Sequence, residues 1–313
     1  MTGNPMGPLG TTRRRPRLSD AETGRRMLDT ALAMVHESGL TVSLEHISLE
    51  DVIREAGVSR SAVYRRWPYK DMFFSDLLRE LASGAGPVIG ADNLEAIDRV
   101  RRILLDRIDW LRTPELRRAL AVEVLRQGAL DEFETFHRSP EWRTYLALHA
   151  TFLSLPDGDL RDEVQAALIG SEQNISARLA AAYERVITLL GCRLRPGTGV
   201  TYESMARLAN ASIRGLVIMA PSSPEIAAQR FTGNPAGAPE AAQWSHPAFG
   251  LAALAIAFIE PDPAVEWTAD DTERFRSELA GENWMKIMGD AAQQPSQQPS
   301  QQPSQQPSRQ PSQ

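Results

Sequence analysis

Apolar residues recur three and four positions apart along most of this chain of 313 residues. This spacing places them on one side of an amphipathic helix. The pattern predicts helices at 19–39, 48–57, 59–67, 70–82, 93–111, 115–126, 141–153, 159–190, 202–219 and 246–259. We expect an interruption near Gly170 within the longest run. Because no stretch keeps the alternation of a half-buried strand, the predicted fold class is all-α.

Proline, glycine and low-complexity sequence divide the chain into four parts. Residues 1–18 form a basic arm, whose arginines either reach into a DNA minor groove or only solubilise the chain. A Gly- and Pro-containing break at 83–87 separates a head at 19–86 from a larger helical region at 87–290. The tail at 291–313 repeats the tetrapeptide QQPS, and a proline at every fourth position excludes helix and sheet. We expect the arm and the tail to be disordered, and we assign the tail no function.

Two short helices around a tight turn are predicted within the sequence SLEDVIREAGVSRSAVYRRWPYK. Ser48 is expected to cap the first helix, Gly57 to end it in the left-handed conformation, and Ser59 to cap the second. Val58 and Val63 stand at the two positions of a hydrophobic staple, which fixes the angle between the helices. Two helices held at a set angle by so short a turn form a helix-turn-helix.

The second of these helices carries one apolar face and one polar face. Val63 and Trp67 are suited to packing, together with the small Ala62. The polar face holds Arg60, Ser61, Tyr64 and Arg65, and Lys70 begins the next helix. Such side chains can reach base edges and phosphates in a major groove. The alternative is an ordinary helical hairpin whose polar face only meets solvent.

The head resembles the DNA-binding domain of the TetR family of bacterial transcriptional regulators over residues 19–81. The family's pattern of turn and recognition helix is matched by Ala56, Gly57, Val58, Ser59, Tyr64, Trp67 and Lys70. The resemblance implies that Ser48 contacts a phosphate, as a threonine often does there in the family. Ser61 and Ala62 replace a glycine and a threonine common in the family, which leaves the base preference open. The predicted DNA-contacting residues are therefore Ser48, Ser59, Arg60, Ser61, Ala62, Tyr64, Arg65 and Lys70.

The negative net charge of the chain lies outside the head. Residues 1–86 contain 12 Lys and Arg against 11 Asp and Glu, a net charge of +1, whereas 87–313 contain 22 against 29, a net of −7. The two sums give the overall −6. Basic residues of the first part gather in two groups, Arg13, Arg14, Arg15 and Arg17, and Arg60, Arg65, Arg66 and Lys70. Their local placement governs phosphate affinity, because charges beyond a Debye length are screened.

Two later helices, at 204–219 and 246–259, are rich in small and apolar residues. Helices of this composition bury themselves either in the core or against a partner. In regulators that resemble this chain, two C-terminal helices pair with their twins in a dimer. We therefore expect a homodimer through these two helices, with internal core packing as the alternative.

An aromatic stripe in the middle of the chain is the predicted ligand site. Trp142, Tyr145, His149 and Phe152 are spaced three, four and three apart, and Trp110 precedes them. Ligand sites are mostly apolar with a few polar groups, so these five residues are candidates, although such a stripe often belongs to the core. The family resemblance, rather than this spacing, implies a small-molecule effector.

Motifs of enzymes and metal sites are missing from the sequence. The five histidines and the single Cys192 have no metal-ligand spacing. We therefore expect no enzymatic activity, no cofactor and no metal. The lone cysteine fits a reducing compartment, with a small buried residue as its simplest role. No apolar run is long enough to span a bilayer, so we expect no membrane partner and a cytoplasmic location.

The sequence predicts a ligand-responsive homodimeric repressor that binds a double-stranded palindromic operator. A three-helix head with its helix-turn-helix would carry the DNA contacts, and the larger helical region would bind the effector and dimerise. One alternative is an activator of the same fold. Another is a small-molecule-binding protein whose head no longer binds DNA.

Overall fold

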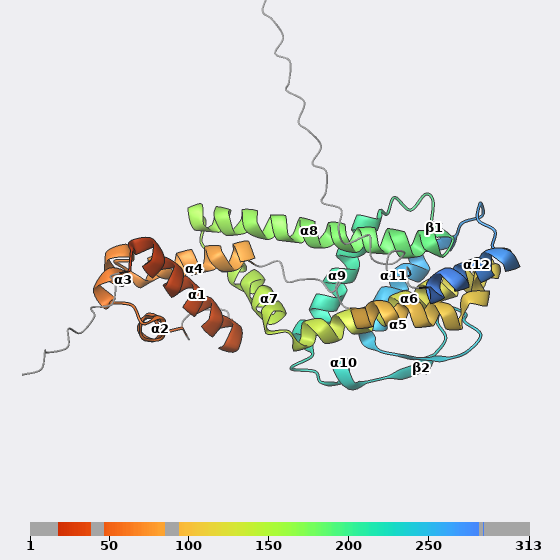
Figure 1. Ribbon diagram of the computed structural model, residues 1–313, viewed down its shortest axis with the longest axis horizontal. Helices are drawn as coiled ribbons and strands as arrows, with labels where there is room; N and C mark the ends of the chain where they lie inside the picture. The colour runs from red at the N-terminus through yellow and green to blue at the C-terminus, as the bar shows by residue number, and fades with distance from the viewer. Residues whose placement is uncertain (1–17, 39–46, 85–93, 282–283, 285–313) are drawn as a thin grey trace, which may run out of the picture.

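The computed structural model describes residues 18–38, 47–84, 94–281 and 284. Most of the basic arm, the predicted helix end at Gly39, part of the break at 83–87 and the QQPS tail lie outside this part. The described residues form an elongated, almost entirely helical molecule, which confirms the all-α class (Figure 1). The helices are α1 (Asp20–Ser38), α2 (Leu49–Ala56), α3 (Arg60–Arg66), α4 (Lys70–Gly84), α5 (Leu94–Asp106), the 3₁₀ helix η2 (Ile108–Arg112), α6 (Pro114–Arg138), α7 (Pro140–Leu153), α8 (Asp159–Leu189), α9 (Tyr202–Met219), α10 (Glu225–Ala228), α11 (His246–Phe258) and α12 (Ala269–Ala280).

The head at one end consists of α1, α2 and α3, with α4 leading away from it (Figure 1). A capping box begins α1: the Ser19 amide donates to the Glu22 carboxylate at 2.7 Å, and the Glu22 amide donates to Ser19 Oγ at 3.2 Å. This pair of bonds confirms the predicted start of the first helix. Met27, Val52 and Val63, from three different helices, are all fully buried in the head.

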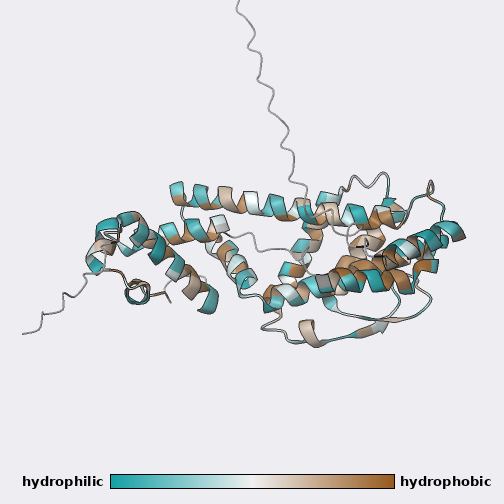
Figure 2. Cartoon of the chain, in the orientation of Figure 1, coloured by the Kyte–Doolittle hydropathy of each residue, from teal (hydrophilic) through white to brown (hydrophobic). Residues whose placement is uncertain are grey.

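The remaining helices form a second, larger helical region. The long α8 contacts α4, α7 and α9, while α11 packs against both α6 and α9. Hydrophobic residues gather in this region of α5, α6, α9 and α11, whereas α12 is mostly hydrophilic (Figure 2). The apolar centre of the molecule therefore lies away from the head, and α4 and α8 connect the two.

Three predicted helix boundaries are wrong. Helix α8 runs without interruption through Gly170, because its packing against three other helices outweighs the cost of about 1 kcal/mol that a glycine adds to a helix interior. The predicted helix at 93–111 splits into α5 and η2 at Arg107, and η2 turns Ile108 and Leu111 into the core. Helix α6 continues beyond Arg126 to Arg138, with Ala129, Phe133 and Phe136 buried along its extension.

Four strands of three residues each form two small antiparallel ladders in the described chain. β1 (Cys192–Leu194) pairs with β4 (Ile259–Pro261), and β2 (Phe231–Gly233) pairs with β3 (Ala242–Trp244). Strands of this length are too short to produce a readable alternation in the sequence. The β1–β4 ladder ties the end of α11 to the segment after α8.

Candidate nucleic-acid interface and ligand cavity

The turn between α2 and α3 has the local geometry that the sequence predicts. Ser48 Oγ accepts the Asp51 amide at 3.4 Å, and Ser59 Oγ accepts the Ala62 amide at 3.3 Å, so both serines are N-caps. Gly57 has φ of 62°, the left-handed conformation that ends α2 and that residues with a Cβ adopt only at a cost. These three residues fix the exit of α3 from the turn.

An apolar inner face anchors α3 to the rest of the head. Val63 is fully buried and Trp67, the C-terminal cap of α3, is 2% exposed. The Trp67 ring meets Phe73 of α4 edge-on, with ring centroids 5.0 Å apart. A partly buried Val58 packs against the same core, as expected for the apolar residue before the N-cap.

The opposite face of α3 is exposed, and its polar groups contact acidic residues of neighbouring helices. Arg60 forms an ion pair with Glu50 of α2 at 2.5 Å, although 73% of the arginine side chain remains exposed. Tyr64 donates its hydroxyl to the same carboxylate at 2.8 Å, and this hydrogen bond raises the pKa of the phenol. Arg65 is paired with Asp20 of α1. The sequence pattern missed both acids, because nothing local couples either of them to α3.

The other predicted DNA-contacting residues have different positions. Ser48, Ser61 and Lys70 are exposed, and Lys70 begins α4. Ser59 Oγ also lies 3.4 Å from Ser61 Oγ, so the two hydroxyls form one polar group beside the turn. Ala62 is only partly exposed, and its amide takes part in the cap of α3. Arginine, tyrosine, serine and lysine groups thus share one end of the molecule.

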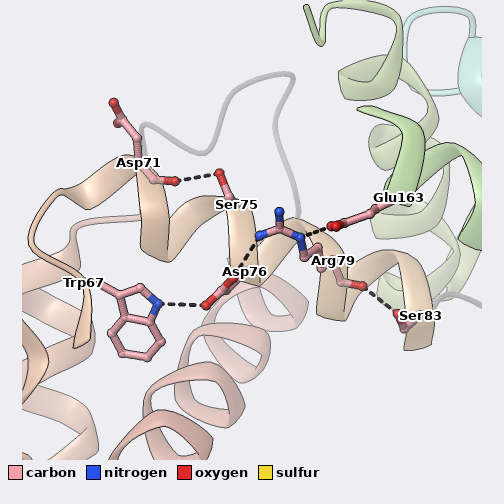
Figure 3. Close-up of polar contacts among 7 residues, drawn as sticks. All are labelled: Trp67, Asp71, Ser75, Asp76, Arg79, Ser83 and Glu163. Carbon is pink, nitrogen blue, oxygen red and sulfur yellow. Dashed lines mark hydrogen bonds and ion pairs between the residues drawn. The ribbon is translucent and has the colours of Figure 1, made fainter. Parts of the chain in front are cut away.

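A chain of polar contacts links the end of α3 to α8 (Figure 3). Trp67 Nε1 donates to Asp76 Oδ2 at 2.8 Å, and Arg79 Nη1 donates to Asp76 Oδ1 at 2.9 Å. The guanidinium of Arg79 also contacts Glu163 of α8. Helix α4 therefore carries contacts to the end of α3 on one side and to the large helical region on the other.

The predicted aromatic stripe packs against a half-buried ion pair between Glu172 and Arg214. Glu172 Oε1 accepts from Tyr145 Oη at 2.5 Å and from Arg214 Nη1 at 2.5 Å, and it lies 3.1 Å from His149 Nε2. The Arg214 guanidinium also lies over the rings of Trp142 and Tyr145, 5.4 and 5.2 Å from their centroids. Burial alone would raise the pKa of Glu172, but these hydrogen bonds together lower it to about 2. The stripe thus joins α7, α8 and α9.

An apolar cavity lined by described side chains lies elsewhere. It has a volume of about 260 Å³ and lies between α5, α6, α8 and α11. None of the five predicted ligand residues lines it, and Trp110 instead borders a smaller pocket of about 60 Å³. Phe152 packs under the guanidinium of Arg161, 4.5 Å from its ring centroid. A ligand role for the stripe stays a prediction. The apolar cavity was not predicted, because its lining comes from four helices that are distant in the sequence.

Helices α9 and α11 each have one buried and one exposed apolar face. Helix α9 exposes Leu208 and Met219, at 49% and 53%, while α11 exposes Phe249 at 36%. The two helices lie close together: a Cβ added to Gly250 of α11 would come within 2.7 Å of Ser212 Oγ of α9. The two helices that carry these exposed side chains are therefore in direct contact.

Two negative findings on the described residues bear on function. Among the described helices, none combines the length with the apolar character that a transmembrane span requires. Within the same part of the chain, no group of three or more histidine, cysteine, aspartate or glutamate side chains has an arrangement that would hold a metal ion. Cys192 is buried, and burial raises the pKa of its thiol to about 11, as expected for a small residue of the core.

Comparison with known proteins gives one informative similarity. Over 90 residues the chain is 33% identical to an uncharacterized helix-turn-helix (HTH)-type transcriptional regulator of Mycobacterium bovis. The aligned part covers 28% of this chain and 46% of the relative, so the chain spans less than half of the relative's length. No family model and no solved structure matches the chain. The similarity supports a DNA-binding regulator and agrees with the geometry of α2 and α3.

Proposed function

We propose that the protein is a DNA-binding transcriptional regulator that inserts α3 into a major groove. The observation that carries this proposal is the division of α3 into a buried face and an exposed face. Val63 and Trp67 anchor the helix, while Arg60, Tyr64 and Arg65 project from it. Arginine is the side chain best suited to bidentate contacts with guanine, and a helix fits the width of the major groove.

The acidic partners of α3 are consistent with this role. In the free protein Arg60 pairs with Glu50, and Arg65 pairs with Asp20. Both ion pairs are exposed, so they contribute little to the stability of the fold. Phosphates and base edges can replace such partners at small cost. The pairs keep the two guanidinium groups extended beside α3 before DNA arrives.

The regulator belongs, in this proposal, to the TetR family, as a homodimeric repressor that responds to a small molecule. The order of α1 to α4 and the residues of the turn support the family. The exposed apolar side chains of the adjacent helices α9 and α11 support a dimer, because exposed apolar surface favours a partner. A two-fold dimer requires a palindromic operator with half-sites roughly 34–36 Å apart.

Ligand control would act through α4 and α8. A ligand that favours one arrangement of the large helical region changes DNA affinity by no more than its preference for that arrangement. The contacts of Arg79 with Asp76 and Glu163 give α4 a path to Trp67. This regulator acts in the cytoplasm and catalyses no reaction.

The test is DNA binding by the full chain, measured by fluorescence anisotropy against the region upstream of its own gene. Arg60→Ala and Arg65→Ala should each weaken specific binding by about 1–3 kcal/mol. Lys70→Ala should weaken binding to all sequences about equally and reduce the salt slope by about 1. Arg274→Ala on α12 is the matched control, because this arginine is 66% exposed and ion-paired at 2.5 Å. Wild-type operator affinity in all three head variants would refute the assigned face.

A further inference from the structure

The cavity between α5, α6, α8 and α11 has mostly apolar walls. Ile97 and Val100 line it from α5, Leu125 from α6, Val186 from α8 and Leu251 from α11. A dry cavity of about 150 Å³ accommodates benzene. The present volume of about 260 Å³ is therefore suited to an apolar group of about two fused rings.

Two polar groups in this cavity have no hydrogen-bond partner. Glu132 Oε1 and Tyr183 Oη are both inaccessible to solvent, and neither has a hydrogen-bond partner. Tyr183 as a whole is only 7% exposed. The adjacent Asp131 behaves differently, because Arg99 and Gln127 each donate to it at 3.0 Å. Buried polar groups without a hydrogen-bond partner are rare and cost free energy. A bound molecule that donates hydrogen bonds to these two oxygens would remove that cost.

The charges around Glu132 indicate which sign of charge a bound molecule should carry. Burial raises the pKa of Glu132 to about 7, and only Arg214 counteracts the effect. Arg214, however, is hydrogen-bonded to Glu172. Arg178, which also lines the cavity, has an interaction of its own. Arg214 thus acts on Glu132 only through its charge, without a direct ion pair, and a cation in the cavity would supply that direct partner.

We propose that this cavity binds a lipophilic amine, whose apolar body fills the space and whose ammonium group donates hydrogen bonds to Glu132 and Tyr183. A primary ammonium has three donors, which is enough for both oxygen acceptors. The inference rests on the proposed function only in treating this amine as the effector of the regulator. Binding itself needs no DNA.

Three probes of similar size and different charge test the assignment: 1-naphthylmethylamine, 1-naphthalenemethanol and 1-naphthaleneacetate. Isothermal titration calorimetry with the full chain at pH 8 should give the amine an affinity about tenfold or more above those of the alcohol and the acid, since hydrogen bonds to charged groups are the stronger ones. Equal or tighter binding of the acid, which Arg178 would attract, overturns the proposal. Absence of binding by all three probes at millimolar concentration overturns it as well.

Variants locate the bound amine. Glu132→Gln should remove the preference for the amine while leaving the affinity for the alcohol within a factor of about three. Gly128→Leu should abolish binding of all the probes, because Gly128 lines the cavity and a Cβ added there meets no atom within 4 Å. Leucine also favours a helix more than glycine does, so this variant is expected to fold. An amine preference that persists in Glu132→Gln, or probe binding that persists in Gly128→Leu, places the amine elsewhere and overturns the proposal.

Binding should also depend on pH. The charged or titratable groups near Glu132 are Asp131, Arg178, Tyr183 and Arg214. Helices α5 and α11 contribute only apolar side chains to the cavity wall. Glu132 ionises as pH rises through about 7, so amine affinity should increase between pH 6 and pH 8 while alcohol affinity stays constant. Constant amine affinity over this range contradicts the pairing.

A separate measurement distinguishes this inference from the proposed function. Operator binding is followed by anisotropy with and without saturating 1-naphthylmethylamine. If the amine binds but no variant of the head changes DNA affinity, the proposed regulator fails while the cavity assignment stands. If DNA binds as proposed but no probe enters the cavity, only the cavity assignment fails.

Discussion

Single side chains have very different roles in this protein according to what surrounds them. Glu50, Glu132 and Glu172 are all glutamates on helices, yet one lies on an exposed face, one lines an apolar cavity and one accepts three hydrogen bonds. Their ionised forms are therefore stabilised to different extents. Two predictions at this scale follow from Glu132 and Glu50.

Glu132→Gln should stabilise the protein more at high pH than at low pH. The pKa of Glu132 is raised by burial from 4.5 to about 7 in the folded protein. The unfolded chain therefore ionises first, and wild-type stability falls as pH rises from 4.5 through 7. Each pKa unit corresponds to about 1.4 kcal/mol, so the loss is about 3 kcal/mol. Glutamine does not titrate. Urea unfolding of both proteins at pH 4.5 and pH 8 measures the effect, and an equal difference at both pH values contradicts it.

Glu50→Gln should strengthen non-specific DNA binding. The carboxylate of Glu50 holds Arg60 and Tyr64 and would repel a phosphate. Removing it should tighten binding about three- to tenfold at low salt and steepen the salt dependence by about one unit. Glu55→Gln is the control, because Glu55 is an exposed acid on the same helix that forms no ion pair with Arg60. An equal gain in both variants would show that charge alone, and not the release of Arg60, is responsible.

At the scale of elements, the helices are joined by a few polar contacts within apolar packing. The aromatic stripe of α7 packs around Arg214 of α9, and Glu172 of α8 completes the group. Arg214 is only 13% exposed on its side chain. A buried cation depends on its partner, because its hydration shell is lost.

Glu172→Ala should therefore destabilise the protein by about 1.5–3 kcal/mol, since it removes the carboxylate that is hydrogen-bonded to the largely buried Arg214. Glu203→Ala is the matched control: its pair with Arg207 on α9 has side chains that are 52% and 62% exposed. Such an exposed pair contributes about 0.5 kcal/mol or less. Chemical denaturation compares the two variants, and similar losses would mean that Arg214 finds other partners.

At the scale of the whole molecule, the proposed DNA-contacting helix α3 lies at one end of an elongated chain (Figure 1), whereas α5, α6, α8 and α11 line the cavity. The two parts are joined by contacts of α4 with α8 and of α1 and α4 with α7. The exposed apolar faces of α9 and α11 belong to the large helical region. Dimerisation there would set the distance between two heads.

Leu208→Asp and Ala253→Glu should each convert the proposed dimer into a monomer at micromolar concentration. Both residues are exposed, one on α9 and one on α11, and a charge in an apolar interface has no partner. Sedimentation equilibrium gives the oligomeric state, and anisotropy should show operator affinity falling with it. Leu153→Asp is the control, because Leu153 is 79% exposed on α7. A wild-type chain that is already monomeric would refute the dimer.

Local features of the fold could be predicted from the sequence, whereas its long-range pairings could not. The caps at Ser48 and Ser59 and the turn at Gly57 depend on residues within a few positions, so they can be predicted from the local sequence. The same is true of the apolar periodicity that buries Val63 and Trp67. The continuity of α8 was mispredicted because tertiary packing, rather than the local cost of a glycine, decides it.

The sequence by itself determined the helical class and the polar face of α3. Only the tertiary structure decided which distant groups come together: Glu50 pairs with Arg60, Glu172 pairs with Arg214, and Glu132 and Tyr183 line the same cavity. Helical periodicity states which side of a helix is buried, but not which helix covers it. Pairing between distant residues depends on how the helices pack, and that is a property of the folded molecule.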